Sequence, residues 1–496
     1  MNRPPDGGRV RPSSTRCAIA RAKMKENQLK KNSLGLWSLV FFVVAAASPL
    51  TGVIGGLPVA MSAGNGAGIP AMYVLAGAIL LVFSFGYIAM SRYVTNAGAF
   101  YSYIALGLGQ RTGVSALTVA LLAYFAIQIA VVALFGFFSQ MYVQDHLGVN
   151  LPWWTYSGAM LLVICYLGIE SVEIGGKVLG ILMLLEVGIV LLTDIAILWL
   201  HGPQPLTFAS FTPSVVQQGN LGIALVFTIA AFIGFESTAI YGEECREPAK
   251  TIPRATLMAV VLITLFFALT SWAMVQAYGL EQVREQALNN PGRFVFDVAS
   301  RLLGPWSEQV MSLLLITSLF AAAQAFHNNI SRYLFSISRD GVLWSKMAQV
   351  RSGKGTPYIA SLVQTLMMLA LLLALTAGGA DPMMHIFAWG SAVATMAILL
   401  LQGGVSLAVV MFFRRAPHYP ASAWSRLWAP LCSAVSMGVA LLMVSDNMDV
   451  LSGSSSQLVF FIPWAVVGIA LAGYLFACWT QQTGRAFTLE NMNSRG

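Results

Sequence analysis

Long apolar stretches dominate this chain, and short polar segments separate them. Twelve of them are long enough to cross a bilayer, which takes about 20 apolar residues in a helix. Several prolines stand at or just before the expected helix starts, where a missing N–H costs little. The pattern predicts an all-α polytopic membrane protein with twelve transmembrane helices. The expected spans are 36–62, 69–91, 113–141, 153–169, 176–200, 220–241, 254–279, 306–338, 357–376, 384–411, 427–445 and 457–480.

The composition supports this class. Of the 496 residues, 57% are hydrophobic and only 10% are charged, and the mean hydropathy is +0.72. A soluble domain of this size does not have such a composition. Cysteines do not cluster, so we expect neither a disulfide framework, nor a metal site, nor a cofactor. They are Cys17, Cys165, Cys245, Cys432 and Cys478.

The basic residues predict the orientation in the membrane. If the N-terminus is cytoplasmic, 25 of the 28 lysines and arginines lie on the inner side. The other three are Arg284, Arg293 and Arg301, all in the loop 280–304, which we expect to form a short amphipathic helix at the outer face. Because lysine and arginine are retained on the cytoplasmic side, we expect a plasma-membrane protein with both termini in the cytoplasm. The net charge of +8 therefore reflects topology and does not indicate nucleic-acid binding.

Two spans are interrupted near their middle. The first contains two prolines and three glycines between Pro49 and Pro58, and the sixth contains Gly234 followed by Glu236. Glycine and proline weaken helices. The two spans are five apart and enter the membrane from opposite sides, which predicts an inverted repeat. Broken spans at matching positions of two halves are typical of a transporter binding site.

The helix ends freed by such breaks suit a zwitterionic ligand. The start of a half-helix offers N–H groups and a positive dipole end to a carboxylate, and the end of one offers carbonyls to an ammonium group. The alternatives are that the glycines serve helix packing, that Glu236 only bonds a neighbouring helix, and that Phe232 and Phe235 face core or lipid. The candidate substrate-binding residues are Thr51, Gly52, Val53, Ile54, Gly55, Gly56, Phe232, Ile233, Gly234, Phe235 and Glu236.

Three motifs resemble those of the amino acid–polyamine–organocation (APC) superfamily of permeases. Residues 232–236 and 243–254 are similar to its GFE…EE…P…IPR signature. Residues 97–103 resemble its small-Gly-Gly-x-Tyr segment. Residues 331–341, followed by Thr356-Pro357, resemble its R…RDG…TP pattern. Together the motifs cover about ten spans in the expected order.

The resemblance implies the five-plus-five inverted-repeat fold of the leucine-transporter type, with two extra C-terminal helices. It also implies import or exchange of amino acids or amines. The chain departs from the family where many members have a glycine-rich run ending in Ile-Phe. Ala230 also stands where some arginine–agmatine exchangers carry a gating tryptophan. The expected parts are a cytoplasmic tail 1–33, a core 34–415 with repeats at about 36–200 and 220–411, two helices in 416–480, and a cytoplasmic tail 481–496.

Two intramembrane carboxyls are candidates for proton coupling. Glu186 lies among apolar residues of the fifth span, which in this fold packs beside the broken first span. Glu236 adjoins the expected substrate site. A charge at such depth marks a functional site by default, although a structural role for Glu186 is an equal alternative. A proton-relay role for His327 is a lesser alternative to helix contact. Cytoplasmic salt bridges, not substrate contacts, are expected of Glu243, Glu244, Arg332, Arg339 and Asp340.

The function that these features predict is secondary active transport of amino acids or related amines by alternating access, with proton coupling as one mode. An exchanger of the same fold is the main alternative. A membrane-embedded enzyme would need clustered catalytic or metal-binding residues such as HExxH, and none occurs. A channel or pump subunit is disfavoured because intramembrane ionisable residues are few, and an ATP-driven mechanism because the chain has no P-loop. Substrate identity, coupling ion and oligomeric state are left open.

Overall fold

The computed structural model describes residues 35–94, 99–170, 172–200, 206–241, 244–339, 341, 343–448 and 461–482. Helices, with no strand, build this described part, and ten of them are long and apolar enough to cross a membrane. The all-α polytopic class is therefore confirmed. These ten helices are Leu36–Ala63, Gly66–Ser91, Gln110–Leu147, Gly180–Trp199, Pro248–Tyr278, Pro305–Arg339, Tyr358–Ala377, His385–Arg415, Trp424–Ser445 and Ile462–Gln482.

The other two expected spans have shorter or broken helices. One is α8 (Trp153–Glu170), and the other is α11 (Leu221–Ala230) followed by α12 (Ser237–Ile240). The count of twelve, the inverted repeat and the domain boundaries therefore stay predictions. Besides α8, the main elements that precede α11 are α2 (Leu36–Ala47), α3 (Pro49–Thr51), the π-helix η1 (Gly52–Gly56), α4 (Leu57–Ala63), α5 (Ile69–Ser91), α6 (Ala99–Leu108), α7 (Gln110–Leu147) and α9 (Val172–Trp199). The main elements that follow α12 are α13 (Pro248–Tyr278), α14 (Val283–Asn289), α15 (Phe294–Leu303), α16 (Pro305–Arg339), α17 (Tyr358–Ala377), the π-helix η6 (Pro382–Phe387), α18 (Ala388–Arg415), the π-helix η7 (Trp424–Trp428), α19 (Ala429–Ser445) and α21 (Ile462–Gln482).

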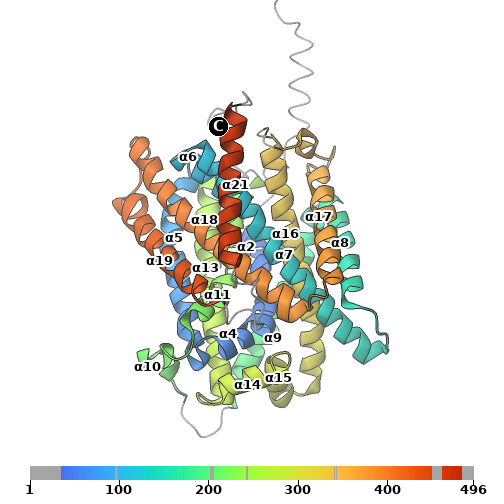
Figure 1. Cartoon of the computed structure of the whole chain (residues 1–496). Coiled ribbons are helices and arrows are strands. Elements are labelled where there is room, and N and C mark those ends of the chain that lie inside the picture. The colour runs from blue at the N-terminus through green and yellow to red at the C-terminus, as the bar shows by residue number, and fades with distance from the viewer. Residues whose placement is uncertain are drawn as a thin grey trace, which may run out of the picture.

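Two local expectations are refined. Residues before the third span form a separate helix, α6, because Gly109 adopts a φ of 109° that an α-helix cannot continue through. The loop 280–304 forms two short helices, α14 and α15, where one was expected. These two lie at the end of the molecule opposite α6, near the short helix α10 (Pro213–Val216) (Figure 1).

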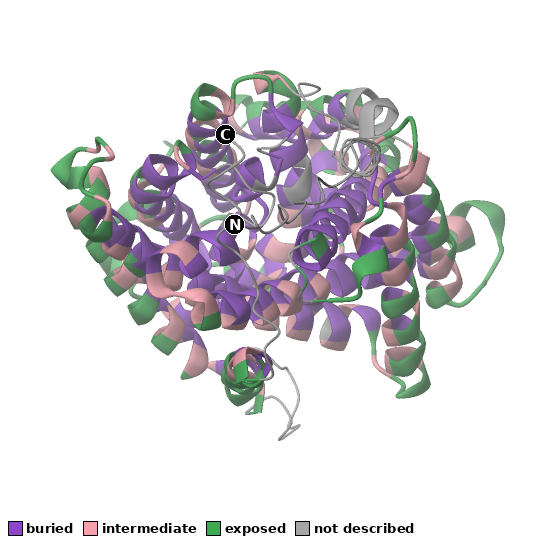
Figure 2. Cartoon of the chain, turned by 90° about the horizontal axis from the view of Figure 1, so that it is seen from above, coloured by how far each residue is buried: buried purple, intermediate pink, exposed green. Residues whose placement is uncertain are grey.

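The outer helices turn apolar side chains away from the protein. Seen along the bundle, buried residues fill the middle and exposed ones form the rim (Figure 2). Trp464 and Leu475 of α21 and Leu442 of α19 are more than 60% exposed. An aqueous surface rarely carries so much contiguous apolar area. Together with the ten helices of membrane-spanning length in the described part, these faces identify a multi-pass membrane protein.

Each half of one broken span packs against one half of the other. The C-terminal half of the first, α4, packs against α11, and the N-terminal half, α2, packs against α12. The two breaks therefore lie at a similar depth in the bundle. Two unbroken helices, α9 and α16, flank the first break at α3.

Candidate functional site

The first break falls at Ser48. Its φ of 46° is left-handed, a conformation that costs a non-glycine residue roughly 1–2 kcal/mol. Pro49 follows it, and the proline ring disfavours the helical region for the residue before it. The Ser-Pro pair therefore ends α2 and starts α3 in a new direction.

Hydroxyl groups from two spans gather at this break. The Ser48 Oγ lies 2.7 Å from the Thr51 Oγ1 and 2.8 Å from the Ser318 Oγ of α16. All three residues are buried. Glu186 of α9 is 2% exposed, and its carboxyl lies beside the Ser318 hydroxyl. The structure thus brings one coupling candidate, Glu186, to the polar cluster at the first break.

The glycines after this break are wound into η1. The Gly52 amide donates to the Ser48 carbonyl at 3.0 Å, and the Gly52 carbonyl accepts from the Leu57 amide. A carboxylate cannot take the Gly52 amide while this turn persists. Val53 and Ile54 are buried in the core, Gly55 faces Leu134, and Gly56 faces open space.

The second break spans residues 231–236, a run of turns between α11 and α12. Gly234 has a φ of 112°, which favours glycine. Backbone bonds use the Ala230 and Phe232 carbonyls. The Ala231 and Ile233 carbonyls accept no hydrogen bond within the described part of the chain. These two oxygens are the acceptors that the break leaves for a donor such as an ammonium group.

Glu236 braces the second break. Its Oε1 accepts a hydrogen bond of 2.6 Å from the Tyr124 hydroxyl of α7, and its Oε2 accepts from the Gly234 amide at 3.0 Å. The Glu236 carbonyl accepts from the Tyr87 hydroxyl of α5 at 2.8 Å. The side chain is fully buried. This geometry matches the alternative in which Glu236 ties neighbouring helices together, and it holds the turn in which the free carbonyls lie.

The two phenylalanines of the second break lie in the protein core. Phe232 is 1% exposed and Phe235 is 0% exposed. The Phe235 ring meets Phe83 of α5 edge-on at 6.0 Å. In this conformation the rings therefore contribute packing, which agrees with the core alternative and not with contact to lipid.

Sequence reasoning did not single out several residues that build the site. The sequence does indicate a helix break at Ser48, because this residue precedes a proline inside an apolar span. Nothing in the sequence points to Tyr87, Tyr124 or Ser318, since a single hydroxyl in an apolar helix does not reveal its partner. Asn329 of α16 donates to the Ser237 Oγ at 2.6 Å.

The expected cytoplasmic ion pair is buried. Arg332 Nε and Nη2 donate to the two Glu244 oxygens at 2.6 and 3.1 Å. The Arg332 guanidinium also lies 4.5 Å from the centre of the Tyr241 ring, and that ring stacks on Phe42 of α2. We call Arg332, Glu244, Tyr241 and Phe42 the inner clamp. Of the other expected members, Glu243 and Asp340 lie outside the described residues, and the Arg339 guanidinium lies 5.3 Å from the centre of the Phe335 ring.

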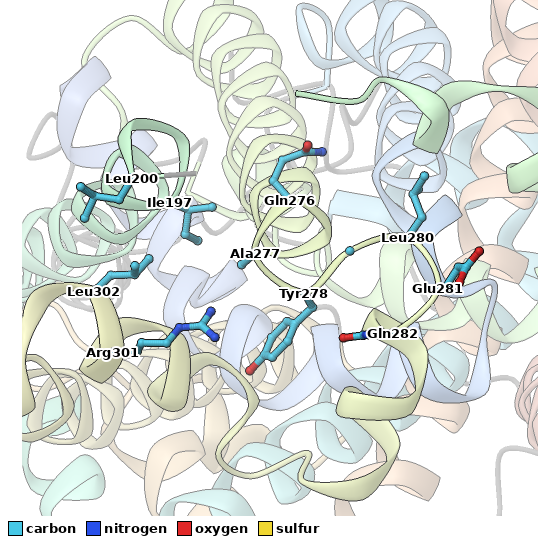
Figure 3. A pocket seen from close by; sticks show the side chains of 11 residues that line it. Ile197, Leu200, Gln276, Ala277, Tyr278, Leu280, Glu281, Gln282, Arg301 and Leu302 are labelled. Atoms are coloured by element: carbon cyan, nitrogen blue, oxygen red, sulfur yellow. The ribbon is translucent and has the colours of Figure 1, made fainter. Parts of the chain in front are cut away.

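A hollow lies away from both breaks. Its volume is about 740 Å³, and Ile197, Gln276, Tyr278 and Arg301 are among its lining residues (Figure 3). These residues lie at the ends of α9 and α13 and in α15. By the expected orientation, the hollow opens at the outer face.

Comparison with solved structures supports the fold. A mutant of the Eremococcus coleocola manganese transporter matches with a TM-score of 0.59 and 16% identity, over 94% of this chain and 99% of that one. MhsT in complex with L-phenylalanine matches with a TM-score of 0.58 and 15% identity, over 84% and 98%. At such identities the likeness concerns the fold alone.

Comparison with curated proteins finds amino acid transporters. The Asc-type amino acid transporter 1 of Mus musculus is 26% identical over 305 residues, covering 59% of this chain and 55% of its own. The branched-chain amino acid permease BcaP of Bacillus subtilis is 24% identical, covering 43% of each. The L-lysine transport protein of Corynebacterium glutamicum is 25% identical, covering 58% of each. The matched part thus spans about half the length of these relatives.

The amino acid permease profile matches residues 39–482, from the first broken helix to the last helix of the described structure. This match covers both helix breaks, the inner clamp and the motifs that suggested the APC superfamily. On this evidence the chain belongs to the amino acid permease family.

Proposed function

We propose that this protein is a secondary transporter that moves amino acids or related amines across the plasma membrane by alternating access. The observation that carries the proposal is the pairing of two broken spans at similar depth, with hydroxyls at one break and free carbonyls at the other. Such breaks are where transporters of this kind bind substrate. Family membership and the transporter relatives support the same activity.

The substrate's common groups would use the two breaks differently. The Ser48, Thr51 and Ser318 hydroxyls can donate to a carboxylate. The Ala231 and Ile233 carbonyls can accept from an ammonium group. Gly56, whose missing side chain leaves open space, would allow backbone approach. Since relatives named for branched-chain amino acids and for lysine both match the chain, the substrate class proposed is amino acids as a whole.

The orientation proposal has its own test. We expect Lys354→Cys to react only with reagent on the cytoplasmic side, and Asn290→Cys only from outside. Both positions are exposed. The reason is the asymmetric distribution of basic residues. Labelling with an impermeant maleimide in intact cells measures it. Cys245 is unsuitable as a reporter because it is only 3% exposed, and reaction of position 354 from outside would contradict the topology.

Coupling to protons is the finer proposal, with Glu186 and Glu236 as candidates. Glu186→Gln and Glu236→Gln each keep the shape of the side chain and remove its exchangeable proton. We expect one of them to lose accumulation driven by a pH gradient while exchange of substrate across the membrane continues. If Glu186 is the coupling residue, Glu186→Gln keeps exchange. If Glu236 is the coupling residue, Glu236→Gln can also lower exchange, because its side chain braces the second break.

Proteoliposomes loaded with labelled amino acids measure both activities, with and without a pH gradient. A competition panel in the same vesicles reports the substrate range. Thr193→Val serves as the control, because among the described residues the Thr193 hydroxyl bonds only the Ile189 carbonyl of its own helix. Unchanged accumulation in both glutamine variants, or uptake driven by sodium alone, would rule out this coupling. Exchange without net accumulation would favour the exchanger.

A further inference from the structure

Asp194 is a second buried acid on α9, outside the candidate substrate site. The residue is 1% exposed. Its Oδ2 accepts a 2.7 Å hydrogen bond from the Thr270 hydroxyl of α13. Its Oδ1 has no hydrogen-bond partner among the described residues. An unpartnered buried carboxyl oxygen is costly, so this side chain calls for an explanation.

The hollow at the outer end lies directly beyond this acid. Ile197 lines the hollow and follows Asp194 on α9 by three residues, a rise of about 4.5 Å. Gln276 and Ala277 line it from α13, the helix that carries Thr270. Figure 3 shows Ile197 and Ala277 among the residues that line the hollow. One helical turn of apolar residues, of which Ala196 and Ile197 are buried, therefore separates Asp194 from the hollow.

The charge around Asp194 is sparse. No ion pair joins it to a basic residue in the described part of the chain. Neither α2 nor α3, which also pack on α9, carries a titratable residue. By the expected orientation, the titratable or charged groups on the outer halves of the elements packed against α9 are Tyr156 of α8, Tyr278 of α13, Asp297 and Arg301 of α15 and Glu308 of α16. Glu186 lies deeper on α9 itself.

This donor set suits a proton better than a metal ion. Hard cations such as Ca²⁺ collect about six to eight oxygen ligands, whereas Asp194 is joined here by one hydroxyl. A proton needs a single oxygen, and Oδ1 is unpartnered within the described residues. We propose that Asp194 is a proton-binding site that exchanges with the outer aqueous phase through the hollow.

The site also has a place in transport, and this part rests on the proposed function. Glu186 lies eight residues before Asp194 on α9, a rise of about 12 Å, at the first break. A movement of α9 against α13 that opens the turn at Ile197 would expose Asp194 to the hollow. The same helix carries Glu186, so protonation from outside and rearrangement at the break would be linked through α9.

Infrared difference spectroscopy tests the proton site directly. Purified protein is reconstituted in lipid vesicles, and the external pH is raised stepwise. A carbonyl stretch of a protonated carboxyl is expected to decrease in the wild type, and Asp194→Asn is expected to lack that component. Ile197→Trp places a larger side chain at the wall of the hollow and should slow the decrease of this band at least several-fold. Thr193→Val, next to Asp194 but bonded within its own helix, should leave it unchanged.

Two results would overturn the proposal. One is a difference spectrum of Asp194→Asn identical to that of the wild type. The other is a band assigned to Asp194 that responds only to internal pH or to neither side. Thermal stability of Asp194→Asn, measured in parallel, establishes that the variant is folded. Thr270→Val, which removes the hydroxyl and keeps the carboxyl, provides a second variant and should shift the band without abolishing it.

Transport assays then separate this proposal from the proposed function. In vesicles, Asp194→Asn is expected to flatten the dependence of amino acid uptake on external pH, with substrate exchange retained. If the wild type transports no amino acid, the proposed function fails, and the infrared result still decides whether Asp194 exchanges a proton. An unaltered pH profile in a transporting Asp194→Asn variant overturns the link to transport.

Discussion

Glu244→Ala is expected to destabilise the protein by about 3–5 kcal/mol, because it leaves Arg332 buried without its partner. The side chains of both residues are at most 6% exposed, and the two hydrogen bonds between them are bidentate. Circular dichroism or a fluorescence melt in detergent measures the loss as a lower Tm. The uncharged pair Glu244→Leu with Arg332→Met is expected to recover most of the loss, since no buried charge is left.

An exposed ion pair supplies the control. Lys250 and Glu247 form a salt bridge whose side chains are 72% and 63% exposed. Surface pairs of this kind contribute little, so Lys250→Gln is expected to leave the Tm almost unchanged. Equal losses in Glu244→Ala and Lys250→Gln would contradict the importance of burial.

The inner clamp also predicts a change in accessibility. It joins α16 to the segment after α12 and, through the Tyr241 ring, to Phe42 of α2. Releasing it should let the inner halves of the broken spans separate. Cys245, 3% exposed beside the clamp, should then react faster with a permeant maleimide in a variant whose other cysteines are replaced. Reaction at the wild-type rate would show that the clamp supports stability without closing this side.

Gly52→Ala is the second substitution with a large expected effect. A Cβ at this position would lie 2.5 Å from the Cζ of Phe267. The ring cannot move away easily, because Phe267 is 1% exposed and stacks on Tyr73 at 5.0 Å. Overpacking of this kind typically costs about 1–3 kcal/mol. We therefore expect a lower Tm and less protein in the membrane.

A matched glycine and a compensating change make this test specific. A Cβ added at Gly56 would meet no atom of the described residues within 4 Å, so Gly56→Ala should keep or raise the Tm, as alanine favours helices. Phe267→Leu combined with Gly52→Ala should restore stability, because the shorter side chain makes room. If Gly52→Ala instead kept its Tm but lost substrate binding, Gly52 would serve ligand approach and not packing.

The sequence by itself determined the class of the protein and the position of its two breaks. Apolar runs of about 20 residues have few alternatives to a transmembrane helix, because backbone groups in lipid must bond within the segment. Pro49 and Gly234 mark the breaks because their backbone properties act locally: proline restricts its own φ and that of the residue before it, and glycine can adopt a positive φ. The motifs around Glu236 and Arg332 identified the family, which the profile match confirms.

Tertiary structure decided the partners. The meeting of Ser48 with Ser318, of Glu236 with Tyr124, and of Arg332 with Glu244 joins residues 88 to 270 positions apart, and no local pattern encodes such pairings. Packing also distinguishes the two glycines: a Cβ at Gly52 would meet the Phe267 ring of α13, whereas a Cβ at Gly56 would meet no atom of the described residues within 4 Å. Which polar groups face each other depends on how helices pack, and that is a property of the whole bundle.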